Sequence, residues 1–145
     1  MEKLTVAIGA DHGGFELKEK IVEYLKSKNI QYKDFGTFSN ESCDYPEYAK
    51  KVAQAVSNKE FSRGILVCGS GIGMSIVANK FKDVRAALCW NESTAKSART
   101  HNNSNILCLG ERQLEDVFAL ELAGIWLNTE FEGGRHKTRI DMIEE

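Results

Sequence analysis

Several features that mark particular classes of protein are scarce or missing in this sequence of 145 residues. A single proline and dispersed charge argue against long disordered segments. Lysine and arginine number 19 against 21 acidic residues, a formal charge of −2, whereas proteins that bind duplex nucleic acid usually have a basic excess. No apolar run approaches the roughly 20 residues needed to span a membrane, and the first residues lack the apolar core of a signal peptide. We therefore expect a cytoplasmic protein with no nucleic-acid and no membrane partner.

Metal-ligating and redox motifs are missing as well. Consecutive cysteines are at least 19 residues apart, which excludes C-x-x-C motifs and is unlike a secreted disulfide scaffold. The three histidines, His12, His101 and His136, form no His-x-x-x-His pair, and no acidic cluster has ligand spacing. We therefore expect no metal site and a metal-independent route for any proton transfer.

The order of apolar patterns predicts an α/β fold. Hydrophobic residues make up 42% of the chain, and short β-branched runs alternate with longer segments of helical period. The predicted strands are Leu4–Gly9, Gln31–Phe35, Arg63–Cys68, Val84–Leu88 and Asn105–Leu109. The predicted helices are Phe15–Ser27, Tyr48–Ser57, Gly71–Lys80, Glu92–His101 and Gln113–Leu127, and a short charged helix follows Gly133-Gly134. This pattern is typical of one three-layer, Rossmann-like domain (residues 1–145), with a doubly wound sheet of five parallel strands, flanking helices and a C-terminal helical tail.

Polar residues are expected to gather at one edge of that sheet. In doubly wound folds, ligands bind at the carboxyl ends of the strands. Four predicted strands lead into polar or glycine-rich turns, which are Gly9–Gly14, Cys68–Gly73, Trp90–Ser93 and Gly110–Arg112. We expect His101 and Asn102, at the end of the helix before the last strand, to lie on the same side as these turns.

The turn from Cys68 to Gly73 is the strongest local signal. Its three glycines let backbone amides surround an anion or a developing oxyanion next to a helix N-terminus. A P-loop is excluded because no Gly-Lys-Ser/Thr follows. Met74 stands where a dinucleotide fingerprint needs glycine and where a cysteine-dependent phosphatase needs arginine. The remaining alternative is an ordinary glycine-rich turn between a strand and a helix.

Cys68 has the most reactive location of the thiols. Cysteine is usually a buried residue that packs like a small hydrophobe, and we expect that role for Cys89 and Cys108. Cys68 instead ends a strand and faces a helix N-terminus, a position that favours the thiolate form. After the first strand, Asp11 and His12 precede two glycines, so both side chains can face a ligand.

Three arginines are candidates for binding an anionic group. Arg135 and Arg139 are four residues apart, so on a helix they share one face and can hold a phosphate between them. The alternative is a solvated basic turn. Arg112, just past the last strand, either caps its own loop or reaches into the crevice of a neighbouring subunit.

Seven stretches of the chain together point to one known family. They are Gly9–Gly14, Asp44–Pro46, Gly64–Val77, Asn79-Lys80, Arg85–Ala87, His101-Asn102 and Gly133–His136. In this order they resemble the type B ribose-5-phosphate isomerases, a family that also includes galactose-6-phosphate and allose-6-phosphate isomerases. The resemblance covers essentially the whole chain. Many members carry threonine where this chain has Ser70, which keeps the hydroxyl and loses the methyl group.

The resemblance implies an aldose–ketose isomerase of the non-oxidative pentose phosphate pathway. Such an enzyme interconverts D-ribose 5-phosphate and D-ribulose 5-phosphate without a metal or an organic cofactor. By similarity, Cys68 is the base that moves a proton between C1 and C2 through an enediolate. Asp11 and His101 are the groups that open the furanose ring, assisted by Ser70.

The resemblance also implies how the substrate is held. Backbone amides of the glycine-rich turn and Asn102 would form the oxyanion hole, while His12 and the three arginines would bind the phosphate. The full implied set of binding residues is Asp11, His12, Gly69, Ser70, Gly71, Ile72, Gly73, Asn102, Arg112, Arg135 and Arg139.

Two other functions stay open at this point. A hexose-6-phosphate isomerase would use the same groups in a pocket deeper by one carbon, for which Phe38 and Tyr45 are candidate walls. A flavodoxin-like module that binds a flavin or nucleotide would share the fold. That module would need hydroxyl-rich phosphate loops, and the loop of residues 10–14 has no serine or threonine.

The apolar pattern of the predicted helix Gln113–Leu127 indicates self-association. Its apolar residues surround more of the helix than one sheet-facing stripe requires, as expected if a second face meets another copy of the chain. We expect a homodimer, or a tetramer of two dimers, whose crevice is completed across the interface by Arg112; the tail is a second candidate. The alternative is that these residues only cover the edge of the sheet.

Overall fold

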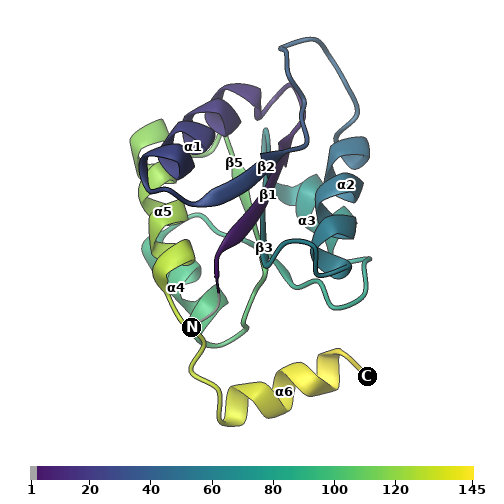
Figure 1. Ribbon diagram of the computed structural model, residues 1–145, viewed down its shortest axis with the longest axis vertical. Coiled ribbons are helices and arrows are strands. Elements are labelled where there is room, and N and C mark those ends of the chain that lie inside the picture. Colours follow the sequence, from purple (N-terminus) through teal and green to yellow (C-terminus); the bar gives the residue numbers. More distant parts are fainter. Residues whose placement is uncertain (1–2) are drawn as a thin grey trace.

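The computed structural model describes residues 3–145, and within them it has one parallel sheet of five strands and six helices (Figure 1). The strands are β1 (Thr5–Ala10), β2 (Gln31–Asp34), β3 (Arg63–Cys68), β4 (Ala86–Leu88) and β5 (Ile106–Gly110). The helices are α1 (Phe15–Ser27), α2 (Tyr45–Ser57), α3 (Ile72–Ala78), α4 (Glu92–Thr100), α5 (Asp116–Asn128) and α6 (Arg135–Ile143). The strand order β2-β1-β3-β5-β4 puts β3 at the centre and β4 at an edge. The predicted Rossmann-like, doubly wound fold is confirmed.

Helices cover both faces of the sheet (Figure 1). α1, α4 and α5 lie on one face, and α2 and α3 lie on the other. Side chains of β3 alternate between the two cores, so that Ile65 and Val67 belong to the first and Leu66 and Cys68 to the second. All six residues of β3 are buried, which explains why the strand reads as a continuous uncharged run after Arg63. Cys68 therefore ends the central strand on the side of α2 and α3.

Most boundaries agree with the sequence patterns, and α1 and β3 match in full. α2 begins at Tyr45 rather than Tyr48, because Pro46 fits the first turn of a helix, where its missing N–H is not needed. α5 begins at Asp116 rather than Gln113, because the chain first makes a tight turn in which the Gln113 amide donates to the Gly110 carbonyl (3.0 Å). Within residues 3–145, none of the helices combines the length and the apolar character that crossing a membrane requires.

Most of the apolar side chains of α5 pack against the core of the same chain. Leu122 and Trp126 are fully buried, and α5 contacts α1 and α4 as well as the sheet. Leu114, Leu120 and Ile125 are partly buried against the same core. Val117 and Phe118, in the first turn of α5, remain 71% and 37% exposed, so they are the part of the apolar surplus left for contact with a second copy of the chain.

Candidate active site

The turn after β3 holds the Cys68 thiol in place. Cys68 is only 5% exposed, and its Sγ accepts a hydrogen bond from the Gly71 amide at 3.0 Å. Gly71 has a φ of 79°, and a Cβ there would lie 2.9 Å from the carbonyl carbon of Leu109. Position 71 therefore requires glycine for the chain to bring this amide to the sulfur. The Ile72 amide donates to Ser70 Oγ (3.2 Å), which orients the hydroxyl on the same turn.

Asp11, after β1, is fixed by the start of α1. Its Oδ1 accepts hydrogen bonds from the amides of Gly13 (2.9 Å) and Gly14 (3.2 Å), so the carboxylate satisfies amides at the helix entry. A Cβ at Gly14 would lie 2.3 Å from the Val67 carbonyl oxygen, so only glycine lets α1 begin this close to β3. The Asp11 side chain is thereby held beside the turn that carries Cys68.

Arg112 lies in the site of its own chain. The pairing of β3 with β5 continues beyond the strands, because the Glu111 amide donates to Cys68 O (2.9 Å) and the Arg112 amide to Gly69 O (3.0 Å). A Cβ on Gly69 would lie 2.8 Å from Arg112 Nη1, so the guanidinium lies against this glycine. The prediction that Arg112 reaches into another subunit's crevice assumed that β5 ends far from the glycine-rich turn. That assumption is wrong, since β5 is the direct neighbour of β3.

These side chains surround one cavity of about 470 Å³ at the carboxyl edge of the sheet. Its lining consists of Asp11, Tyr45, Cys68, Gly69, Ser70, Ile72, Gly73, Ile76, Arg112 and Gln113. Tyr45 is a wall, as predicted, with its ring against Gly73. Phe38, the other predicted wall, is 70% exposed and does not line the cavity. The sequence argument missed Ile76 and Gln113, although Ile76 lies one helical turn after Ile72 and could have been found by that spacing.

His12 lies next to the cavity without lining it. The Cys43 amide donates to Nδ1 of His12 at 3.1 Å. Because Nδ1 accepts this bond, the proton of the neutral ring is on Nε2. That nitrogen is a donor suited to an anionic group, consistent with the predicted phosphate role.

The other predicted site residues lie at the opposite edge of the sheet. In a parallel sheet each connecting helix returns from the carboxyl end of one strand to the amino end of the next, so α4 ends at its C-cap, His101, beside the start of β5. The prediction that His101 and Asn102 lie on the side of the glycine-rich turn is therefore wrong within one chain. α6, which carries Arg135 and Arg139, extends beyond the same amino edge (Figure 1). A strand of five residues separates the two edges by about 17 Å.

Contacts within the chain order this second group. The rings of His101 and His136 stack with centroids 4.4 Å apart and planes 14° apart. Burial, followed by the neighbouring His101, lowers the pKa of His136. Arg135 and Arg139 are exposed on α6, so both guanidinium groups are accessible to a phosphate.

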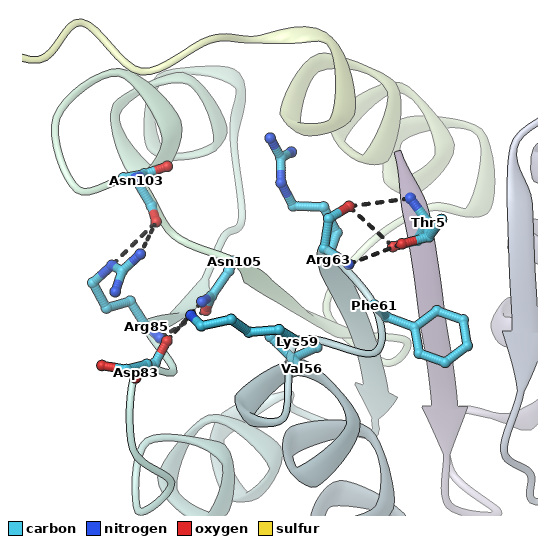
Figure 2. Close-up of a pocket in the computed structure, with 10 residues that line it drawn as sticks. Thr5, Val56, Lys59, Phe61, Arg63, Asp83, Arg85, Asn103 and Asn105 are labelled. Carbon is cyan, nitrogen blue, oxygen red and sulfur yellow. Dashed lines mark hydrogen bonds between the residues drawn. The ribbon is translucent and has the colours of Figure 1, made fainter. Parts of the chain in front are cut away.

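A separate polar cavity of about 370 Å³ also lies at the amino edge, and Figure 2 shows the residues around it. The Arg85 guanidinium donates to the carbonyl oxygens of Asn102 (3.3 Å) and Asn103 (3.0 and 3.1 Å). It also donates to Glu144 Oε1 (2.8 Å), just after α6. None of the predicted site residues lines this cavity, and its Arg85 ties the loop after α4 to the end of α6.

The other buried thiols have the packing roles that the sequence predicts. Burial raises the pKa of Cys89 to about 11 and raises that of Cys108 as well. Both thiols therefore stay protonated at neutral pH. All four cysteines are unpaired.

A doubly wound parallel sheet with a thiol, a carboxylate and an arginine around one cavity at its carboxyl edge defines an α/β enzyme with a site for a small polar ligand. The comparison with known families narrows this class. The chain belongs to the ribose/galactose isomerase family, whose profile matches residues 6–143. The resemblance seen in the sequence is thus confirmed.

Individual relatives match over nearly their whole length. The ribose-5-phosphate isomerase B of Escherichia coli is 44% identical over 138 residues, which are 95% of this chain and 93% of the relative. The structure of ribose-5-phosphate isomerase B from Clostridium thermocellum matches with a TM-score of 0.96 at 48% identity, covering 97% of this chain and 95% of that one. The Mycoplasma genitalium ribose-5-phosphate isomerase B, solved with bound ribulose-5-phosphate, matches with a TM-score of 0.94 at 41% identity, covering 99% and 96%.

Proposed function

We propose that this protein interconverts D-ribose 5-phosphate and D-ribulose 5-phosphate by proton transfer. The observation that carries the proposal is the position of Cys68, whose sulfur accepts a backbone hydrogen bond at the wall of a cavity shared with Asp11 and Arg112. Relatives of this family that match over nearly the full chain are ribose-5-phosphate isomerases, and one of them holds ribulose 5-phosphate.

The reaction requires a base and a stabiliser of negative charge. In the open-chain aldose, the hydrogen on C2 is weakly acidic because it lies next to the C1 carbonyl. The Cys68 thiolate takes this proton, negative charge develops on O1 in the enediolate, and the resulting thiol returns the proton to C1. A proton passes from O2 to O1 in the same sequence, so the isomerisation balances without a co-reactant.

The oxyanion would accept hydrogen bonds from backbone amides that do not donate to the Cys68 sulfur. The Gly71 amide donates to Cys68 Sγ, where it offsets negative charge on the thiolate. This leaves the amides of Gly69 and Gly73, together with Asn102, to stabilise charge on the substrate oxygens. Ser70 and Asp11 lie on the same cavity wall and serve ring opening.

We propose that a second subunit completes the site. Arg112 is in place beside Cys68, whereas His101, Asn102, Arg135 and Arg139 lie at the far edge of the same sheet. A homodimer in which each amino edge meets the partner's cavity brings the two groups together. In this arrangement the partner supplies the ring-opening imidazole of His101 and the phosphate-binding guanidinium groups of the tail.

The surface best suited to this second copy is the β4 edge. Ala86–Leu88 are half-buried, and a groove of about 610 Å³ along them is also lined by Asn102 and Ile143. Ile72 and Ile76, on the rim of the Cys68 cavity, are 52% and 58% exposed. Unpaired edge strands with apolar surroundings are usually covered in the native assembly. Four unpaired thiols suit a reducing compartment, and we place the enzyme in the cytoplasm.

A hexose 6-phosphate is the second candidate substrate. The family description itself names galactose alongside ribose, and the same thiol, carboxylate and arginine would serve a sugar longer by one carbon. A flavin or nucleotide ligand is less suited to the cavity, which has Tyr45 as its one aromatic wall and no hydroxyl in the loop after β1.

An isomerisation assay with purified protein tests these assignments. Ribose 5-phosphate, allose 6-phosphate and galactose 6-phosphate are each supplied alone, and ketose formation is measured. We expect kcat/KM for ribose 5-phosphate to exceed the others by about tenfold or more, the usual discrimination for one carbon. A higher value for a hexose phosphate would assign the second candidate, and failure to isomerise any of the three would overturn the proposed function.

A further inference from the structure

Three side chains of types that ligate metals converge where α4 ends and α6 begins. Ligand atoms of His101, Glu132 and His136 all lie within 4.8 Å of one another. His136 Nε2 is 3.6 Å from Glu132 Oε1, and the two imidazole rings are stacked. His101 is distant from the other two residues in sequence, so spacing along the chain does not reveal this group.

Backbone hydrogen bonds hold the three residues together. The Glu132 amide donates to the Thr100 carbonyl (3.1 Å), which fastens the segment before α6 to the last turn of α4. The His136 amide donates to the Gly133 carbonyl (3.2 Å). Gly133, with a φ of 74°, makes the turn that lets Glu132 and His136 face the same neighbour.

We propose that His101, Glu132 and His136 form a binding site for a divalent transition-metal ion such as Zn²⁺. Two imidazole nitrogens and one carboxylate oxygen are a ligand set that zinc accepts, with water in the fourth position. Metals bind the neutral imidazole.

The geometry needs a small closure around the ion. Tetrahedral zinc with bonds of about 2.0–2.1 Å requires ligand atoms about 3.3 Å apart. His101 and Glu132 are exposed, so their side chains can turn toward the buried His136. His101 leaves its stack with the His136 ring when it does so. Arg135 and Arg139 act electrostatically on His136 and oppose the cation, so the site is weaker than a structural zinc site.

The ion would inhibit the enzyme. When His101 ligates the metal, its imidazole is not available for opening the sugar ring. This consequence rests on the proposed function. Binding itself does not rest on it, because all three ligands belong to one chain.

Metal titration tests the site directly. Zn²⁺ is titrated against the purified protein in competition with a chromophoric chelator, and we expect one ion per chain. Glu132→Gln and His136→Asn should each weaken binding by about tenfold or more, since even the loss of an outer-sphere partner costs that much in metal sites. Glu130→Gln is the matched control, because it makes the same charge change two residues away and should leave the affinity unchanged.

The absorption spectrum of bound Co²⁺ distinguishes binding at this site from binding at the thiols. Imidazole and carboxylate ligands give weak visible bands, whereas thiolate ligands add intense near-ultraviolet charge-transfer absorption. We expect the visible bands alone, unchanged in Cys68→Ala. Equal affinity in the Glu132→Gln and His136→Asn variants, or loss of the metal in Cys68→Ala, would overturn the proposal. Binding without inhibition of isomerisation would leave the site in place and contradict the role of His101.

Discussion

The Gly71 amide and the Cys68 sulfur form a donor–acceptor pair 3.0 Å apart. The pair exists because position 71 adopts a left-handed conformation at the point where β3 turns into α3. This hydrogen bond fixes the position of the sulfur. Because the Gly71 amide donates to the sulfur, it is not available to donate to the substrate.

Removing the thiol should abolish most turnover. Cys68→Ala is expected to lower kcat by about 10²–10⁴-fold, the usual contribution of a general base, with little change in the fold. Steady-state kinetics on the purified variant measure the effect. Cys89→Ala and Cys108→Ala are the controls, since burial keeps both thiols protonated and neither lines the cavity. Near-normal kcat in Cys68→Ala would remove this residue from the mechanism.

Adding a side chain at position 71 should damage both stability and the Cys68 contact. Gly71→Ala places alanine at a φ of 79°, which costs about 1–2 kcal/mol, and its Cβ would also meet Leu109 at 2.9 Å. Gly133→Ala is matched in φ, at 74°, but has nothing within 4 Å of its Cβ. Urea unfolding should therefore show a larger loss for Gly71→Ala. Equal losses would mean that the contacts around position 71 add nothing to the backbone strain.

Local sequence was sufficient for the elements and for the carboxyl-edge site, but not for contacts that the fold creates. α1 has one apolar stripe and β3 one uncharged run, so their bounds follow from side-chain period. Asp11 follows β1, and Cys68 and Ser70 lie at the end of β3 and just beyond it. Parallel strands bring such positions to one edge of the sheet. His101 was misplaced because it ends a helix, which runs against the strands. The stacking of His101 on His136 depends on the packing of α6 next to the end of α4, and no local sequence pattern predicts that packing.

The tail arginines should act on the phosphate group. Arg135→Ala or Arg139→Ala is expected to raise KM, and to lower kcat if the phosphate aligns the sugar over the base. Inorganic phosphate should inhibit the parent competitively and the two variants more weakly. Lys137→Ala is the matched control, because this exposed cation on the same helix is paired with Asp141. Unchanged KM and unchanged phosphate inhibition would show that the segment with Arg135 and Arg139 is a solvated basic turn with no role in binding the phosphate.

Stability should fall as the pH drops below the ordinary pKa of histidine, because of His136. Its pKa in the folded state is lowered from 6.5 by burial and by His101. Well above pH 6.5 the ring is neutral in both states and contributes nothing. Below it, the unfolded chain binds a proton that the folded chain does not, so the free energy of unfolding decreases until the folded-state pKa is reached.

The difference between two denaturation series isolates this contribution. The parent and His136→Asn are unfolded in urea from about pH 7.5 to about pH 5.5, the range in which histidine titrates, with a chelator present. We expect the decline to be shallower in the variant, while Thr138→Asn, on the same helix, follows the parent. Parallel curves for the parent and His136→Asn would contradict the lowered pKa.

Mixing inactive subunits should show which residues act across an interface. Cys68→Ala and His101→Ala chains are combined and allowed to exchange, and activity is measured. If His101 comes from the partner, each heterodimer has one site with both lesions and one intact site. Random exchange of equal amounts makes about half of the dimers heterodimers, so the activity of the mixture returns toward about a quarter of the parent's. The pair Cys68→Ala and Arg112→Ala should give no recovery, because both residues line the cavity of one chain and every mixed site keeps one lesion. Recovery in the second pair and not in the first, with exchange demonstrated, would reverse the assignment of these two residues to their subunits.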